Sequence, residues 1–405
     1  MKQAVHISSL YDMPGPVSGS FEVFFRNLAA CLNESAELSG WKTQVVPRAE
    51  SRRLASGVKS AFEAPSFVGK NLHSALARFK RRLEIKALIG AYSGKLAEYS
   101  GLIAGADIVH AHDPFAALAF VKMKRSKAGA KLCLTPGYIS GLDETAPERP
   151  WLMEAEAEAM ELADFLMVPS CAYFSALNRV YGPLKKNHVV LPGLEDSKHI
   201  KTGILRERLR VPPSALLVTA FYGPGAASDA DFFLEAFALA RSKVPGRIFG
   251  LISGLKTTGL EDRIKALDLE GSFAMLEPDA PDWDVLAETD IFFSAFSRPL
   301  VELGTIEAFR AGVAVVAADD GWNAEAAGYG EAAMLFKSGE AASAGSALAE
   351  IAGHPSALIH FSAKARDYFK VQYSLDALAG RAARAYSEMV GAETREVKFV
   401  ELGRK

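Results

Sequence analysis

Residues 287 to 320 read AETDIFFSAFSRPLVELGTIEAFRAGVAVVAADD. The apolar run Ile291 to Phe293 has the length and aromatic content of a short buried strand, and Val313 to Ala318 is a second one. Between them, Leu303 to Ala311 has helical periodicity and ends at a glycine, which suits the position after a helix. Strand, helix and strand in about thirty residues form one βαβ crossover. We therefore expect a parallel sheet in which the loop from Ser297 to Gly304 faces a ligand.

The same alternation of strands and helices continues over most of the chain, which is typical of an α/β fold. At 405 residues the chain is too long for one compact core, so we expect two domains. The formal net charge of −2 gives no case for a nucleic-acid partner. Three cysteines without CxxC spacing indicate reduced thiols. With no signal peptide and no long apolar run, these features predict a cytoplasmic protein.

The block IEAFRAGVAVVA, residues 306 to 317, resembles the EAmAxGxPVVA signature of retaining, GT-B-fold glycosyltransferases of family 4, also called glycosyltransferase group 1. In that family an E-x7-E motif binds the nucleotide sugar: the second Glu holds the ribose, and the first contacts the donor hexose. Glu307 matches the second Glu, which implies a ribose contact. Pro299 stands at the first position, and Glu302, nearby but out of register, is the candidate for the sugar contact.

Two other segments resemble the same family and set the domain boundaries. ADFLMVPS, residues 163 to 170, is similar to the last strand of the family's first domain, and VVLPGLE, residues 189 to 195, to its interdomain linker. The resemblance implies two Rossmann-like domains facing across a cleft. The expected division is 1–194 on the acceptor side, joined by a closing helix at 374–390, then 195–373 for the nucleotide sugar, and a loose tail at 391–405.

Several family positions carry other residues here. The family's His after Thr135 is missing, and Pro224 replaces an Arg that neutralises the donor diphosphate. Ser228 or Asp229 stands near the position of a Lys with the same task. Such cations stabilise the charge that develops on the leaving group, and losing one preorganised donor costs about 10²–10³ in rate in other enzymes. Lys256 and Arg298 are the candidate replacement cations.

Glycine-containing loops are the candidate phosphate contacts. The loop at residues 12 to 20, with Gly15 and Gly19, lies between an expected strand, Ala4 to Ser9, and an expected helix, Phe21 to Leu32. Its amides could hold an anion, and Gly223 follows the first strand of the second domain in the same way. The loop lacks GxGxxG, so a plain βα turn is the alternative.

The segment ADIVHAHDP, residues 106 to 114, resembles the family's DvvHaHdp and places His110 and His112 at the end of a strand. Acceptor contact, packing within a cleft and metal binding are three interpretations of this pair. A third and fourth metal ligand are not evident in the sequence. We therefore expect no metal ion and no cofactor beyond the nucleotide-sugar substrate, and we name both histidines as candidate catalytic residues.

Two charged segments have a plain and a functional interpretation. Residues 52–95 hold ten Lys or Arg and two Glu, which predicts either a solvated basic helix or docking to an anionic membrane surface. The helix Trp151 to Ala163 carries several glutamates, Glu156 among them, which we expect on a solvated face, and a paired acid–base site is the alternative.

The sequence therefore predicts a glycosyltransferase of hexosyltransferase type that uses a nucleotide-sugar donor with retention, in glycan, glycolipid or polysaccharide biosynthesis. The expected partners are a nucleotide sugar or nucleoside diphosphate and a sugar or lipid-linked acceptor. The expected location is the cytoplasm, and docking of the basic segment would place the protein peripherally on the inner face of the membrane. The alternative function is a catalytically inactive binding or scaffold subunit of a partner enzyme, because the departures fall in four separate motifs.

Overall fold

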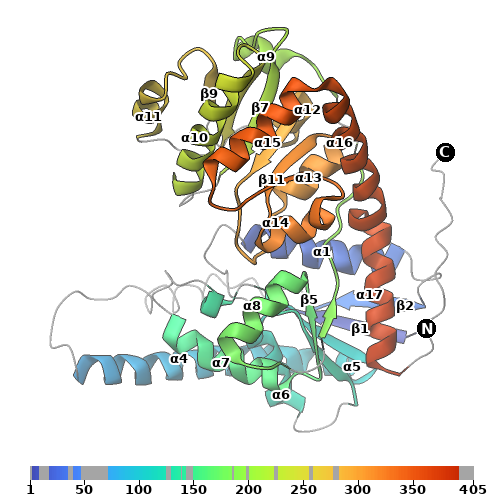
Figure 1. Ribbon diagram of the computed structural model, residues 1–405. Coiled ribbons are helices and arrows are strands. Elements are labelled where there is room, and N and C mark those ends of the chain that lie inside the picture. Colours follow the sequence, from blue (N-terminus) through green and yellow to red (C-terminus); the bar gives the residue numbers. More distant parts are fainter. Residues whose placement is uncertain are drawn as a thin grey trace. The chain divides into compact units, whose positions relative to one another are not determined.

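The computed structural model describes residues 2–8, 18–34, 40–46, 72–124, 129–137, 139–142, 149–184, 187–197, 200–222, 227–254, 259–276 and 282–391. Two compact units make up the chain. Unit 1 consists of Met1–Pro192 and Leu378–Lys405, and unit 2 consists of Gly193–Ala377. Figure 1 shows strands and helices alternating along the chain in both units. In the described residues, no helix is long and apolar enough to cross a membrane.

Unit 1 is built on a parallel six-stranded sheet in the order β2-β1-β3-β4-β5-β6. The strands are β1 (Lys2–Ile7), β2 (Trp41–Val45), β3 (Ile108–Ala111), β4 (Lys131–Leu134), β5 (Phe165–Val168) and β6 (Asn187–Val189). All four residues of β3 are buried, as expected for a parallel sheet covered on both faces.

The helices of unit 1 connect these strands. They are α1 (Ser18–Glu34), α4 (Leu72–Glu98), α5 (Ser100–Ala104), α6 (Pro114–Lys124), α7 (Arg149–Leu162) and α8 (Cys171–Tyr181), with a 3₁₀ turn, η1 (Ser140–Leu142). Helix α17 (Leu375–Met389) belongs to unit 1 from Leu378 onward. There the indole N–H of Trp41 donates to Ser387 Oγ at 3.1 Å, and the rings of Trp41 and Tyr386 are 5.1 Å apart.

Unit 2 contains a second parallel six-stranded sheet, in the order β12-β11-β10-β7-β8-β9. Its strands are β7 (Leu216–Phe221), β8 (Ile248–Ser253), β9 (Phe273–Leu276), β10 (Ile291–Ser294), β11 (Ala314–Ala318) and β12 (Met334–Phe336). The two strands predicted around residues 291 and 313 are thus adjacent, paired in parallel from Ile291↔Ala314. The predicted α/β fold class is confirmed.

Helices surround this second sheet and close its core. They are α9 (Ile204–Arg208), α10 (Ala227–Lys243), α11 (Leu260–Ala266), α12 (Asp282–Glu288), α13 (Gly304–Ala311), α14 (Gly321–Ala326), α15 (Ala341–Gly353) and α16 (Pro355–Tyr368), with a 3₁₀ turn, η2 (Gly328–Gly330), and a short π-helix, η3 (Phe369–Tyr373). Helices α10 and α15 lie side by side (Figure 1). Beneath them Phe293 stacks between Phe233, at 4.8 Å, and Phe336, at 5.3 Å. Such aromatic burial supplies much of a core's stability.

Two local expectations from the sequence differ from the structure. Helix α1 begins at Ser18, so Gly19 lies in its first turn and not in the preceding loop. Glu156 is 2% exposed, so the expectation of a solvated position was wrong. The turn η1 covers this face of α7, and the Glu156 carboxylate accepts hydrogen bonds from Ser140 N–H at 2.8 Å, Ser140 Oγ at 2.9 Å and the Tyr181 hydroxyl.

Candidate functional site

The strand order places a switch point between β7 and β10 in unit 2. From β7 the chain proceeds to β8 and β9 on one side, and β10 then begins the series β10, β11, β12 on the other. Open parallel sheets bind ligands at the carboxyl ends of the strands where the order reverses. Tyr222 follows β7 there, and the loop from Ala295 to Leu303 follows β10 and leads into α13.

The loop after β10 is held in place by the start of α14. Asn323 is fully buried, and its Nδ2 donates to Ser294 Oγ and to the Phe296 carbonyl, both at 2.8 Å. The Trp322 indole N–H donates to the Glu302 carbonyl at 2.7 Å, and the Trp322 amide donates to the Arg298 carbonyl at 3.1 Å. These contacts fix the backbone of the predicted ligand-facing loop.

Glu302 caps helix α13. Its Oε1 accepts a hydrogen bond of 2.7 Å from the Gly304 amide, the first residue of the helix, while Leu303 at the N-cap position makes no side-chain cap. A Cβ atom at position 304 would overlap this carboxylate and crowd the Phe292 ring, so any other residue there would displace the Glu302 side chain. The Glu302 carboxylate therefore uses an amide at a helix N-terminus, where anions are stabilised.

Glu307 lies in the first turn of α13 and forms an ion pair with Arg310, one turn later. Both side chains are largely buried, with 16% and 8% exposed. Arg310 Nη1 also donates to the Glu195 carbonyl at 3.2 Å, and its own carbonyl accepts from Arg366 Nη1 at 2.7 Å. The residue that the sequence assigns to the ribose is thus held by an arginine that the sequence analysis did not single out.

Tyr222 lies at the switch point of unit 2, and its pKa reflects burial and the charges near it. Burial raises the pKa of Tyr222 well above its ordinary value, and the negative charges of Asp229 and Glu302 raise it further. Asp229 lies in the first turn of α10, which follows β7. Among the described residues the buried Tyr222 hydroxyl has no hydrogen-bond partner. Two carboxylates therefore place negative charge near Tyr222, which precedes the segment where the family resemblance implies two cations.

Two of the other candidates for donor binding, Arg298 and Gly19, lie in the part of the chain that the structure describes. Arg298 is exposed, and its guanidinium lies 5.9 Å from the centre of the Phe296 ring. Gly19 is in the first turn of α1, in unit 1. Gly15, Gly223, Pro224 and Lys256 lie outside the described residues, as does the side chain of Ser228.

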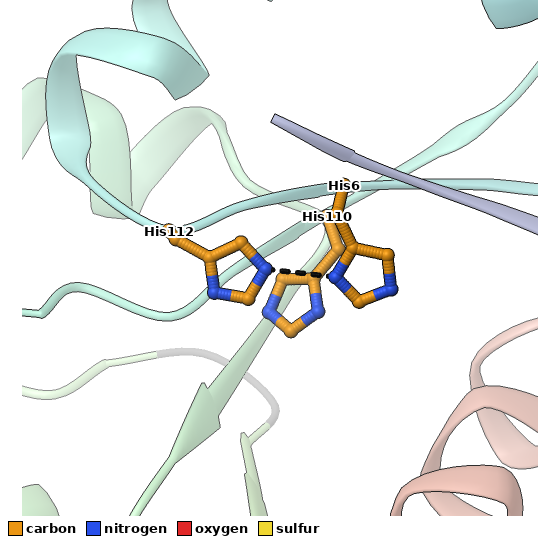
Figure 2. A group of neighbouring side chains, drawn as sticks. All are labelled: His6, His110 and His112. Atoms are coloured by element: carbon orange, nitrogen blue, oxygen red, sulfur yellow. Dashed lines mark hydrogen bonds between the residues drawn. The ribbon is translucent and has the colours of Figure 1, made fainter. Parts of the chain in front are cut away.

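Unit 1 has its own switch point, between β1 and β3, and three histidines meet there. His6 of β1 pairs in parallel register with His110 of β3, so both side chains lie on the same face of the sheet, and His112 follows the end of β3. Figure 2 shows the three rings directed toward one another. His6 Nδ1 and His112 Nε2 are 2.9 Å apart and share a hydrogen bond.

Two hydroxyl groups hold the middle imidazole of this cluster. His110 Nδ1 is 2.6 Å from Tyr386 Oη of α17, and its Nε2 is 2.8 Å from Thr135 Oγ1 after β4. Tyr386 Oη also lies 3.4 Å from His6 Nε2. Burial lowers the pKa of His6 to about 3, and burial and then the charge of His6 lower that of His110 well below its ordinary value. These two imidazoles are therefore neutral at physiological pH.

The sequence analysis named His110 and His112 but missed His6 and Tyr386. The signal for His6 is a polar residue near the end of an apolar first strand, which becomes meaningful only when β1 and β3 are known to be neighbours. Tyr386 comes from a helix, and it lies 276 residues later in the chain than His110. Local spacing does not reveal such a contact.

Comparison with solved structures places the fold in a class. The chain is similar to sucrose-phosphate synthase from Thermosynechococcus elongatus, with 14% identity, a TM-score of 0.68, and coverage of 97% of this chain and 100% of the other. It is similar to Anabaena HepE in complex with UDP-glucose, with 16% identity, a TM-score of 0.64, and coverage of 96% and 100%. A glycosyltransferase from Rickettsia africae ESF-5 has 14% identity, a TM-score of 0.61, and coverage of 97% and 100%.

The two parallel six-stranded sheets and these similarities show that the chain has the GT-B fold seen in glycosyltransferases. No protein-family model matches the chain, and no curated protein matches its sequence. At such low identity the similarity establishes the fold, and function has to be argued from the sites.

Proposed function

We propose that the protein is a glycosyltransferase that takes a sugar from a nucleotide-sugar donor and transfers it with retention of configuration, as the family 4 resemblance implies. The observation that carries this proposal is the GT-B fold over nearly the whole chain, with Glu307 in the first turn of α13, the helix that follows the switch-point strand β10. Similar structures in complex with UDP-glucose and with UDP support a nucleoside diphosphate as the carrier of the sugar.

In this proposal the donor binds to unit 2. Glu307 holds the ribose, Arg298 and Lys256 take the diphosphate in place of the family's cations, and Glu302 contacts the sugar. The amide at Gly223 adds a phosphate contact, the amides at Gly15 and Gly19 of unit 1 remain candidate anion contacts, and no metal ion takes part in donor binding. Arg298 is suited to its part because it is exposed, on a loop whose backbone is fixed by α14. Arginine recognises phosphate through several donors at once.

The acceptor in this proposal is a sugar or a lipid-linked sugar, with His110 and His112 on the acceptor side in unit 1. The protein acts in the cytoplasm, and the basic segment 52–95 docks on the anionic inner face of the membrane. Helix α4 supports this part, because it covers the second half of the segment and exposes Leu83, at 51%, beside basic residues.

A second candidate function is a catalytically inactive subunit that binds a partner enzyme. The specific observation in its favour is the pair Asp229 and Glu302, whose charges act on Tyr222 where a diphosphate would lie. Like charges at this position oppose the binding of a donor. Calorimetric titration with nucleoside diphosphates and nucleotide sugars, combined with a turnover assay on the isolated chain, tests the two functions against each other.

A further inference from the structure

We propose that His6, His110 and His112 of unit 1 form a binding site for a divalent transition-metal ion, with zinc the best match. The site goes beyond the proposed function, because it lies in the other unit from Glu307 and does not depend on whether a sugar is transferred. In the part of the chain that the structure describes, this is the group of three side chains whose donor atoms approach closely enough to hold one ion.

The geometry is close to that of a three-nitrogen site. One nitrogen of each ring lies within 4.8 Å of one nitrogen of each of the other two. A tetrahedral zinc ion holds nitrogens about 2.0–2.1 Å away, and so about 3.3 Å from one another. His6 Nδ1 and His112 Nε2 are 2.9 Å apart, slightly closer than this spacing (Figure 2). An ion at this site requires side-chain rotations that part these two nitrogens and bring a nitrogen of the third ring, now within 4.8 Å, closer to them.

The chemistry of the cluster suits a transition-metal ion, because each of its three side chains offers an imidazole nitrogen. The nearby carboxylate Asp113 accepts a hydrogen bond of 2.8 Å from the Ala116 amide, which occupies one of its oxygens at the start of α6. The cluster therefore presents nitrogens, a ligand set that favours zinc over magnesium or calcium.

The surrounding hydroxyls supply the outer shell that such sites use. A metal-bound histidine usually hydrogen-bonds through its second nitrogen, which fixes the ring orientation. His110 has two such partners, Tyr386 Oη and Thr135 Oγ1, so it can give one nitrogen to the ion and keep a hydroxyl on the other. His112, which is partly exposed, lies at the carboxyl edge of the sheet and provides a path of entry.

The test uses the full chain, stripped of metal with a chelator and titrated with zinc chloride by calorimetry. The expected result is one site per chain with a Kd of about 1 µM or tighter. Cobalt(II) in place of zinc should give the visible absorption of a tetrahedral site. Loss of an outer-shell partner weakens metal binding about 10- to 100-fold. Tyr386→Phe, which removes one outer-shell hydroxyl, should weaken zinc binding within that range, and His112→Ala, which removes a ligand, should weaken it more.

His188→Ala is the matched control, because it removes a histidine of unit 1 that lies outside the cluster and pairs with Glu388. It should leave zinc affinity unchanged. Circular dichroism of each variant separates lost binding from lost folding, and His112 is chosen because it is less buried than His6 or His110. Zinc binding that is absent, or equally strong in wild type and His112→Ala, would overturn the proposal and leave the cluster as a hydrogen-bonded network.

Discussion

The carboxylate of Glu302 accepts a hydrogen bond of 2.7 Å from the amide of Gly304, at the start of α13. This amide is among the groups that a donor phosphate would use at a helix N-terminus. The charges of Asp229 and Glu302 both act on Tyr222. In the proposed donor site these carboxylates would therefore oppose the negative charge of a diphosphate.

Replacing Glu302 by glutamine should strengthen the binding of nucleoside diphosphates. The amide oxygen of glutamine can still accept from Gly304, but the negative charge is removed. We expect an affinity gain of about five- to tenfold, equivalent to about 1 kcal/mol of relieved repulsion. Calorimetric titration with the diphosphate that binds wild type measures the gain. Glu331→Gln makes the same charge change at an exposed position of unit 2 and should alter nothing. Equal affinity in wild type and Glu302→Gln would contradict the prediction.

Replacing Glu307 by glutamine should destabilise unit 2. The substitution leaves the guanidinium of Arg310, which is 8% exposed, without its carboxylate. Removing one partner of a buried ion pair costs about 3 kcal/mol or more. Urea unfolding measures the loss, and the double variant Glu307→Gln/Arg310→Met should recover part of it, because neither charge is then left unpaired. A double variant that is less stable by the full sum of the single losses would show that the pair is not coupled.

Glu156 should make stability fall with rising pH. Burial raises the pKa of Glu156 above 4.5, against hydrogen bonds from Tyr181 and Ser140 that lower it. Between 4.5 and the raised value the folded state keeps a proton that the unfolded state has lost. The free energy of unfolding therefore decreases as pH rises through this window. Urea unfolding at several pH values across the window should show that the free energy of unfolding depends less on pH in Glu156→Gln than in wild type. An unchanged slope would contradict the assignment.

The basic segment should bind anionic membranes. Replacing Lys80, Arg81 and Arg82 together by glutamine should weaken vesicle binding about 100-fold, because each cation near the surface contributes about 1 kcal/mol. Flotation with phosphatidylserine-containing and neutral vesicles measures this effect. The triple variant of Lys265, Lys364 and Lys370, all exposed in unit 2, makes the same charge change as a control. Wild-type protein without preference for anionic vesicles would refute the docking.

The fold could be predicted from the sequence because buried parallel strands are continuous apolar runs. Ile291 to Phe293 and the strand before Asp319 are of this kind, and their helix ends at Gly312, whose φ of 69° is the left-handed value that glycine tolerates. Such signals are local, and the structure confirmed them.

The site was less predictable, because it depends on contacts between distant segments. His6 joins His110 through the register of β1 against β3, and Tyr386 reaches them from α17. Glu156 stands among other glutamates in the sequence of α7, which is typical of a solvated face, but the turn η1 covers it. Arg310 is one turn from Glu307 on the same helix, so spacing could have revealed this pair.

The claim that unit 2 binds a nucleotide-sugar donor can be tested by calorimetric titration of the isolated chain with a panel of nucleoside diphosphates and nucleotide sugars. We predict saturable binding of at least one of them, with a Kd below about 1 mM, equivalent to about −4 kcal/mol. We also predict that Glu307→Gln, checked for folding, weakens this binding. The absence of binding at millimolar concentration for every ligand in the panel would contradict the claim.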